Sequence, residues 1–359
     1  METVARFEIG YTRFLDPAGR AVAPLPPPFD RDPAAVIPLY RAMTLLRAFD
    51  AKAVALQRTG RLGTYAAALG QEAVGVAMAA PMRSDDVLVP SFREQGAQLT
   101  RGVSLLELLL YWGGDERGSD FAGPRQDFPT CVPVGSHAAH AVGVATAIKL
   151  RGEARAVLCS LGDGATSRGD VYEAMNLAGA WRVPVVFVID NNQWAISVPR
   201  DAQTAARTLA QKAIAAGFTG EQVDGNDAIA IHCAVSGALE RARAGGGPHL
   251  IEALTYRLAD HTTSDEASRY RDDAQVSAHW AEDPIARLRA FLVAAGLWDK
   301  EKEEDLIAEN ARALDAAVET YLALPPMPAT AMFDHLFAAL PAALEGQRAA
   351  VAAAAGDDG

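Results

Sequence analysis

The sequence predicts an α/β protein in which helices cover both faces of a parallel sheet. Short runs rich in β-branched residues alternate with helix-like segments through the middle of the chain, and this alternation is typical of parallel sheets. The run Val185–Ile189 is apolar at every position, as expected for a strand that is covered on both faces. We expect three parts: an extended N-terminal arm over residues 1–35, the α/β domain over 36–325, and a helical C-terminal tail over 326–359.

The N-terminal arm is predicted from its prolines. Pro24 and Pro26–Pro28 supply no backbone donors, so this stretch should lie extended over a neighbouring surface. From Val36 to Gln57 apolar side chains recur at every third or fourth position, which predicts an amphipathic helix that faces a core. The repeating positions are Leu39, Met43, Leu46, Phe49 and Val54.

Buried strands and connecting helices make up the predicted domain. The helix Val171–Trp181 should connect two neighbouring parallel strands, and the region from Pro284 onward is helical by its pattern. Within that region the charged run Lys300–Asp305 is expected to be a solvated helix face. The four expected strands are Val87–Val89, Ala156–Ser160, Val185–Ile189 and Leu250–Tyr256.

Composition excludes several classes of protein. The net charge of −12 argues against a nucleic-acid binder, because neutralising phosphates requires clustered Lys and Arg. The apolar runs are far shorter than the roughly 20 residues that span a bilayer, so no membrane segment is expected. The N-terminus lacks the apolar core of a secretory signal, and its acids are atypical of transit peptides, which predicts a cytoplasmic protein. The cysteines, Cys131, Cys159 and Cys233, follow no metal-ligand spacing and are expected to be reduced.

A glycine-flanked acid follows the second expected strand. Gly162-Asp163-Gly164 stands between a strand and a helix, which places backbone N–H groups and a carboxylate at a helix N-terminus, where anions bind. The glycines allow the backbone to approach a ligand closely. An isolated Gly-Asp-Gly is also a common tight turn, so this motif needs a second element beside it.

That second element is the pair Asn191-Asn192, which follows the next strand. The 26 residues that separate it from Gly164 are enough for a helix that connects the two strands. Such a helix brings the ends of both strands to one edge of the sheet, where ligands bind in open α/β folds. The Asp163 carboxylate, the Asn192 amide oxygen and a backbone carbonyl form an incomplete shell of oxygen ligands. Mg²⁺ takes about six oxygens and often obtains the remainder from phosphates and water. The pattern therefore predicts a magnesium-bound diphosphate.

The residue sequences of these motifs resemble those of one family. GDGATSRGDVYEAMNLAGAW and DNNQWAISVPR are similar to the alpha subunits of thiamine-diphosphate-dependent 2-oxo acid dehydrogenases of the pyruvate and branched-chain types. The resemblance continues through GRLGTYAAALGQEA, VPSFREQG, QTAARTLAQKAIAAGF, QVDGND, HTTSDEASRYR and DPIARLRAFLVAAGLW. It implies the thiamine-diphosphate-binding fold, and decarboxylation of a 2-oxo acid with acyl transfer to a lipoyl group.

The resemblance also implies a role for each matching residue of the metal and diphosphate site. Asp163 and Asn192 should bind Mg²⁺ through their side chains, and Trp194 through its carbonyl. Gly164 and Ala165 should donate backbone N–H groups to the diphosphate.

Other matching positions should surround the cofactor. Arg93 aligns with an arginine that binds a phosphate, a task suited to the guanidinium fork. The family usually has tyrosine before this arginine, so Phe92 is expected only to pack. His261 aligns with the active-site histidine and is expected to stay cationic near the diphosphate. Val134 should contact the aminopyrimidine ring through its backbone, and Ile196 is also assigned to the cofactor site.

Three further residues receive no catalytic role. Ser264 matches a regulatory phosphorylation position of mitochondrial relatives, but no regulation is expected here. His137 and His140 are spaced like a metal pair; His140 is expected to be structural, and the role of His137 stays open.

The resemblance implies partners and leaves the substrate open. A beta subunit should supply the glutamate that activates the cofactor, in a heterotetramer of two alpha and two beta chains that transfers its acyl group to the lipoyl domain of an acyltransferase. Pyruvate is favoured because Asp190 precedes Asn191, whereas the run TTSDEASRYR favours a branched-chain 2-oxo acid; acetoin is a further alternative. A catalytically silent, cofactor-binding scaffold subunit is the alternative of a different class.

Overall fold

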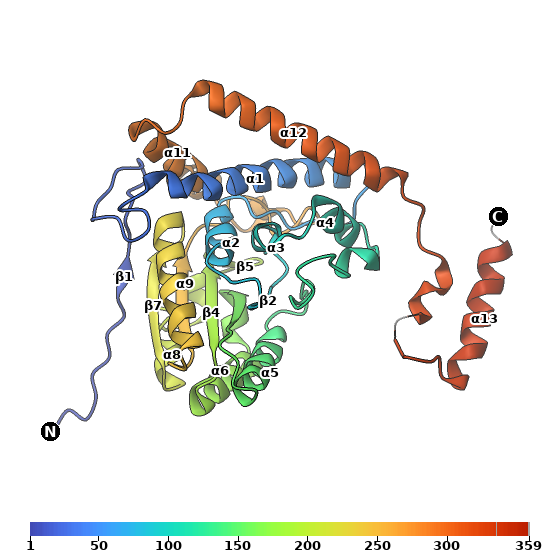
Figure 1. The fold of residues 1–359 in the computed structure, drawn as a ribbon, viewed down its shortest axis with the longest axis horizontal. Helices are drawn as coiled ribbons and strands as arrows, with labels where there is room; N and C mark the ends of the chain where they lie inside the picture. The colour runs from blue at the N-terminus through green and yellow to red at the C-terminus, as the bar shows by residue number, and fades with distance from the viewer. Residues whose placement is uncertain (335, 358–359) are drawn as a thin grey trace. The chain divides into compact units, whose positions relative to one another are not determined.

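A six-stranded parallel sheet forms the centre of the computed structural model, which describes residues 1–334 and 336–357 (Figure 1). The strand order is β1-β7-β8-β4-β3-β2, and every neighbouring pair is parallel. This confirms the predicted α/β class. The strands are Tyr11–Thr12 (β1), Val87–Val89 (β2), Val157–Gly162 (β3), Val185–Asn191 (β4), Thr219–Asp224 (β7) and His249–Leu254 (β8). A separate antiparallel pair joins Trp194–Ala195 (β5) to Val198–Pro199 (β6).

Both faces of the sheet are covered, as the apolar run in β4 predicted. Alternate side chains of a strand point to opposite faces, and those of β4 belong to two separate core clusters. Val186 and Val188 pack with residues of α1, α2, α9 and α11, whereas Val185, Phe187 and Ile189 pack with residues of α5 and α6. All seven residues of β4 are buried.

The helices of these two layers follow the expected order along the chain. The first layer contains α1 (Ile37–Arg58), α2 (Glu72–Ala79), α9 (Ala228–Arg243) and α11 (Pro284–Ala294). The second contains α5 (His137–Leu150) and α6 (Gly169–Trp181). Helix α1 lies across the end of α2 (Figure 1). The remaining α-helices are α3 (Gln95–Arg101), α4 (Leu105–Trp112), α7 (Arg200–Gln203), α8 (Lys212–Ala215), α10 (Asp273–His279), α12 (Lys300–Ala323) and α13 (Ala342–Asp357).

Two strands of the six-stranded sheet, β1 and β7, were not predicted, and neither was the separate pair β5 and β6. β7 has the largely polar sequence TGEQVD, which carries no strand pattern, and it becomes a strand because it pairs with β8 on one side and β1 on the other. The arm that contains β1 is attached by Asp227, whose carboxylate accepts from the backbone N–H groups of Phe14 and Leu15 at 2.7 Å each.

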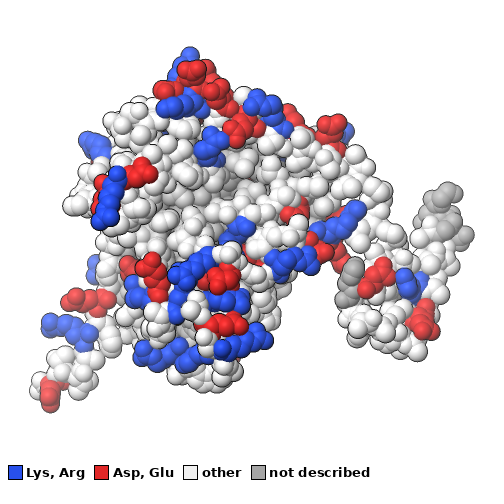
Figure 2. Space-filling view, viewed as in Figure 1, with Lys and Arg blue, Asp and Glu red and all other residues white. Residues whose placement is uncertain are grey.

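The charged run at the start of α12 is solvated, with one exception. These side chains form the mixed red and blue group at the top of Figure 2. Glu303 instead turns inward, where its carboxylate accepts from the hydroxyl of Tyr40 and the indole N–H of Trp298, both at 2.7 Å. A face that the sequence indicated as purely solvated therefore also fastens α12 to the first helix layer.

Contacts divide the chain into two compact units, Met1–Val318 and Glu319–Gly359. Within the second unit a 3₁₀ turn, Ala329–Phe333, packs against α13, and Arg348 pairs with Asp334 at 3.0 Å. The boundaries at residues 35 and 325 stay predictions. Among the described residues, no helix is long and apolar enough to cross a membrane.

Candidate active site

A pocket of about 220 Å³ opens at the carboxyl ends of β2, β3 and β4. The strand register brings these ends together, because Gly162 at the end of β3 pairs with Asp190 near the end of β4. All the residues that the sequence assigned to the site line this one pocket, although their roles in binding stay predictions. They are Phe92, Arg93, Val134, Asp163, Gly164, Ala165, Asn192, Trp194, Ile196 and His261.

Asp163 and Asn192 present oxygen atoms at the polar end of the pocket. Asp163 is 2% exposed, and burial raises the pKa of its carboxyl group. Its carboxylate accepts from Gln203 Nε2 at 2.7 Å, and it forms no ion pair with any described residue. The Asn192 amide is held at both ends: Nδ2 donates to Gln71 Oε1 at 2.7 Å and Oδ1 accepts from the Trp194 N–H at 3.1 Å. This leaves lone pairs on Asp163 and Asn192 for a cation.

The turn that follows Asn192 is conformationally strained. Gln193 and Ile196 have positive φ angles of 71° and 55°, and this region is particularly unfavourable for a β-branched residue. Fully buried Arg257 holds the turn, because its Nη2 donates to the Ile196 carbonyl at 2.9 Å. The turn also packs against Gly164, where an added Cβ would lie 2.6 Å from the Ala195 Cβ. Glycine at this position of the motif is therefore required by packing.

Arg93 lines the pocket, and Arg257 lies behind it, next to the lining residues His261 and Ile196. Arg93 Nη1 donates to the Ala67 carbonyl at 2.5 Å, and its Nη2 donates to the His261 carbonyl at 2.9 Å. Burial, together with Arg257, lowers the pKa of Arg93 to about 10. Neither guanidinium is within salt-bridge distance of a carboxylate in the described part of the chain. Glu94, Asp163 and Asp190 also line the pocket, but burial raises the pKa of each of these carboxyl groups and so disfavours their charged forms. Arg93, which has no carboxylate partner, can bind an anion.

His261 lies between these two arginines. Burial, followed by Arg93 and Arg257, lowers its pKa to about 4. The environment of the chain by itself therefore favours a neutral imidazole, whereas the expected cation depends on a bound diphosphate and stays a prediction. Arg257, which no sequence pattern placed near His261, adds to the larger effects of burial and Arg93. The Phe92 ring meets His261 edge-on, with centroids 5.7 Å apart, so Phe92 packs as expected.

Several residues of the pocket wall were not predicted. Gln71 orients Asn192, and its run GQEA was noted only for its resemblance. Glu94 is buried, and burial raises its pKa to about 7. His137 also lines the pocket, with Nε2 2.6 Å from the Ser160 carbonyl, whereas His140 lies outside it and stacks near Phe128. Arg257 carried no signal at all, since a lone arginine after a strand is unremarkable in sequence.

The fold and site together define an α/β protein with a ligand pocket at the carboxyl edge of its parallel sheet. Residues 40–327 match the family described as "Dehydrogenase E1 component". The chain therefore belongs to the dehydrogenase E1 component family, and the resemblance to the alpha subunits of 2-oxo acid dehydrogenases is confirmed. Membership implies thiamine diphosphate as the cofactor and an alpha–beta enzyme that works with a lipoyl acyltransferase.

Individual relatives carry two kinds of name. The chain is 41% identical over 310 residues to the 3-methyl-2-oxobutanoate dehydrogenase subunit alpha of Mycobacterium tuberculosis, covering 86% of this chain and 84% of the relative. It is 43% identical over 279 residues to the pyruvate dehydrogenase E1 component subunit alpha of Acholeplasma laidlawii, covering 76% and 81%. It is 36% identical over 341 residues to the pyruvate dehydrogenase E1 component subunit alpha of Staphylococcus epidermidis, covering 95% of this chain and 91% of the relative.

Proposed function

We propose that this chain, with a beta subunit, decarboxylates pyruvate using thiamine diphosphate and Mg²⁺ and transfers the acyl group to the lipoyl group of an acyltransferase. The observation that carries the proposal is the charge arrangement of the pocket. The buried Arg93 guanidinium lines it without a carboxylate partner among the described residues, and the buried carboxylate of Asp163 lines it without a cation. A magnesium diphosphate supplies the missing charge of each sign.

The residues of the polar end fit this group. Asp163 and Asn192 Oδ1 would hold Mg²⁺ together with the Trp194 carbonyl, which gives the oxygen-only donor set that Mg²⁺ prefers. The backbone N–H groups of Gly164 and Ala165, with the Arg93 guanidinium, would bind the diphosphate.

The remaining residues shape the reacting end. Bound thiamine diphosphate supplies the nucleophilic carbon that attacks the 2-oxo group and allows CO₂ to leave. Val134, Ile196 and Phe92 give this end an apolar lining, which would limit the access of water once a second chain covers its exposed edge. His261 lines the pocket beside Arg93 and would form a hydrogen bond to the substrate.

The pocket is small, which supports a site completed by a second chain. Its volume of about 220 Å³ is below the about 300–1,000 Å³ of typical small-molecule sites. Large apolar side chains also stand exposed near its mouth, as at a protein interface. They are Val132, Val134, Ile196 and Val198, which are 57%, 43%, 55% and 42% exposed. We infer that the beta subunit covers this edge and contributes the activating glutamate, within a heterotetramer.

A branched-chain 2-oxo acid is the second candidate substrate. It is supported by the name of the Mycobacterium tuberculosis relative and by the run TTSDEASRYR, whereas Asp190 and the relatives named for pyruvate support the first. Comparing CO₂ release from pyruvate and from 3-methyl-2-oxobutanoate by the alpha–beta complex separates the two. Release from neither substrate would favour the silent scaffold.

Titration calorimetry of the alpha–beta complex tests the assigned site. Asp163→Ala should abolish Mg²⁺-dependent binding of thiamine diphosphate, because it removes the only anionic protein ligand of the proposed metal. Asp170→Ala is the matched control, since Asp170 pairs with Arg168 at the surface and does not line the pocket. Unchanged affinity in Asp163→Ala would contradict the assignment.

A further inference from the structure

The segment 63–71, between α1 and α2, contacts two polar side chains of the pocket, Arg93 and Asn192. The Ala67 carbonyl accepts from Arg93 Nη1 at 2.5 Å. Four residues later, Gln71 Oε1 accepts from Asn192 Nδ2 at 2.7 Å. One short stretch of chain therefore sets the orientation of the guanidinium and of the amide.

The same segment also pairs with the loop that carries His261. The Tyr65 N–H donates to Thr263 Oγ1 at 3.0 Å, and the Thr263 N–H donates back to the Tyr65 carbonyl at 2.9 Å. On the other side of His261, the Leu258 N–H donates to the Leu69 carbonyl at 3.2 Å. The segment thus holds the loop on both sides of the histidine.

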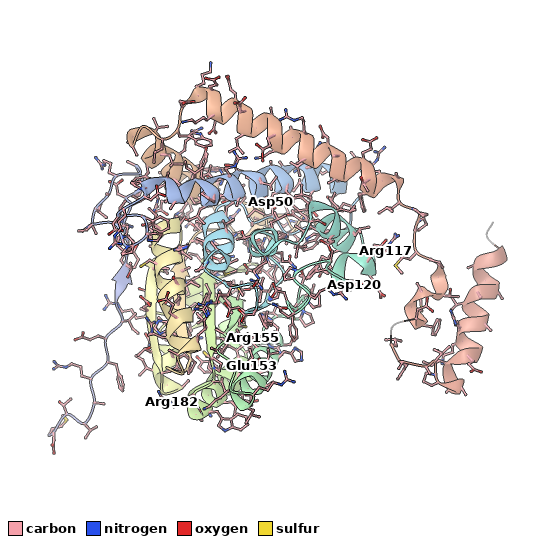
Figure 3. The ribbon with its side chains drawn as sticks, in the orientation of Figure 1. Asp50, Arg117, Asp120, Glu153, Arg155 and Arg182 are labelled. Atoms are coloured by element: carbon pink, nitrogen blue, oxygen red, sulfur yellow. The ribbon has the colours of Figure 1, made fainter. Side chains whose placement is uncertain are left out.

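A carboxylate of α1, that of Asp50, accepts two hydrogen bonds from this segment. Asp50, on α1 (Figure 3), is 4% exposed and does not line the pocket. Its Oδ1 accepts from the Tyr65 hydroxyl at 2.5 Å, and its Oδ2 accepts from the Ala68 N–H at 2.8 Å. Ala67 lies between these two anchored residues, so its carbonyl cannot turn freely while both bonds are intact.

We propose that Asp50 is a positioning residue for the cofactor site, acting through Tyr65 and Ala68 on the Ala67 carbonyl that orients Arg93. The proposal rests on the proposed function, which assigns Arg93 to the cofactor. An amide in place of the carboxylate has one acceptor oxygen and one donor group. In Asp50→Asn the single amide oxygen cannot accept from both the Tyr65 hydroxyl and the Ala68 N–H, so one of these two buried donors loses its acceptor. The segment that contacts Arg93 is then held less firmly.

The affinity of the alpha–beta complex for thiamine diphosphate, measured by calorimetry with Mg²⁺, tests this role. We expect about tenfold weaker binding for Asp50→Asn, the equivalent of about one lost hydrogen bond. Asp227→Asn is the matched control: Asp227 is fully buried and accepts from backbone N–H groups, but it does not line the pocket. It should lower the melting temperature without changing the affinity. Wild-type affinity in Asp50→Asn overturns the proposal.

Two further measurements exclude a merely structural effect. In an Arg93→Lys background, Asp50→Asn should weaken binding little further, because the two residues act in series; fully additive losses would overturn the route through Arg93. Limited proteolysis without cofactor should cleave residues 258–273 faster in Asp50→Asn than in the wild type or Asp227→Asn, and equal rates would also overturn it. Proteolysis needs no cofactor, so its result does not depend on the proposed function. Failure of the proposed function would instead appear as no binding of thiamine diphosphate by the wild-type complex.

Discussion

Glu252, in the middle of β8, holds together the structure beneath the pocket and gives a quantitative prediction. It is 1% exposed, and its carboxylate accepts from four donors. Oε1 accepts from Asn191 Nδ2 at 2.7 Å. Oε2 accepts from the backbone N–H groups of Leu209 and Ala210 at 2.8 and 2.9 Å, and from Gln222 Nε2 at 3.0 Å. One side chain therefore connects β4, β7 and the segment before α8.

The substitution Glu252→Gln converts one acceptor oxygen into a donor. The lower-energy orientation keeps the amide oxygen toward the three donors and turns the NH₂ group toward Asn191 Nδ2. Asn191 cannot simply rotate, since its Oδ1 already accepts from Gln193 N and Nε2 at 3.3 and 3.2 Å. The NH₂ group of the new side chain and that of Asn191 then face each other without an acceptor, which lowers the free energy of unfolding by about 1–3 kcal/mol. Glu252→Ala removes the acceptor of all four donors and should cost about 4 kcal/mol or more.

Denaturant unfolding of the full chain, followed by circular dichroism, measures these differences. Glu240→Gln is the control, because Glu240 is an exposed residue of α9 and its substitution should change stability by less than about 0.5 kcal/mol. Asn191 adjoins Asn192, so Glu252→Gln should also weaken cofactor binding. If Glu252→Gln were as stable as Glu240→Gln, the account of Glu252 as the shared acceptor would be refuted.

Three other predictions concern His261, Gly70 and the need for a beta subunit. The pKa of His261 is lowered from 6.5 to about 4, so its contribution to stability is present above pH 6.5 and is lost as the pH falls toward 4, because only the unfolded chain binds the proton in this window. The stability difference between wild type and His261→Gln should change over that range, and a constant difference in pH-dependent unfolding would contradict this. Gly70→Ala should destabilise more than Gly60→Ala: both have positive φ, but a Cβ at Gly70 would lie 2.6 Å from the Tyr256 carbonyl, whereas Gly60 faces open space. Equal melting temperatures would refute the steric argument. The chain alone, with saturating thiamine diphosphate and Mg²⁺, should release no CO₂ until the beta subunit is added; turnover by the chain alone would show that it carries its own activating glutamate.

Local patterns in the sequence account for most of the main elements. Apolar periodicity predicted a helix over 36–57, and α1 spans Ile37–Arg58. The apolar runs predicted β2, β3, β4 and β8 to within two residues at either end. β7 could not be found in this way, because its strand conformation depends on hydrogen bonds to β1 and β8 rather than on its own composition.

The sequence by itself determined that Asp163 and Asn192 meet at the pocket. Asp163 and Asn192 each follow a buried strand, and parallel strands place their carboxyl ends at one edge, so local order along the chain was sufficient. Only the tertiary structure decided how those residues are held and charged. Asp50 reaches the site through Tyr65 and Ala68, and burial, followed by Arg93 and Arg257, lowers the pKa of His261. These effects depend on burial and on contacts between side chains far apart in the chain, since desolvation and charge repulsion act through space and leave no periodic pattern in the sequence.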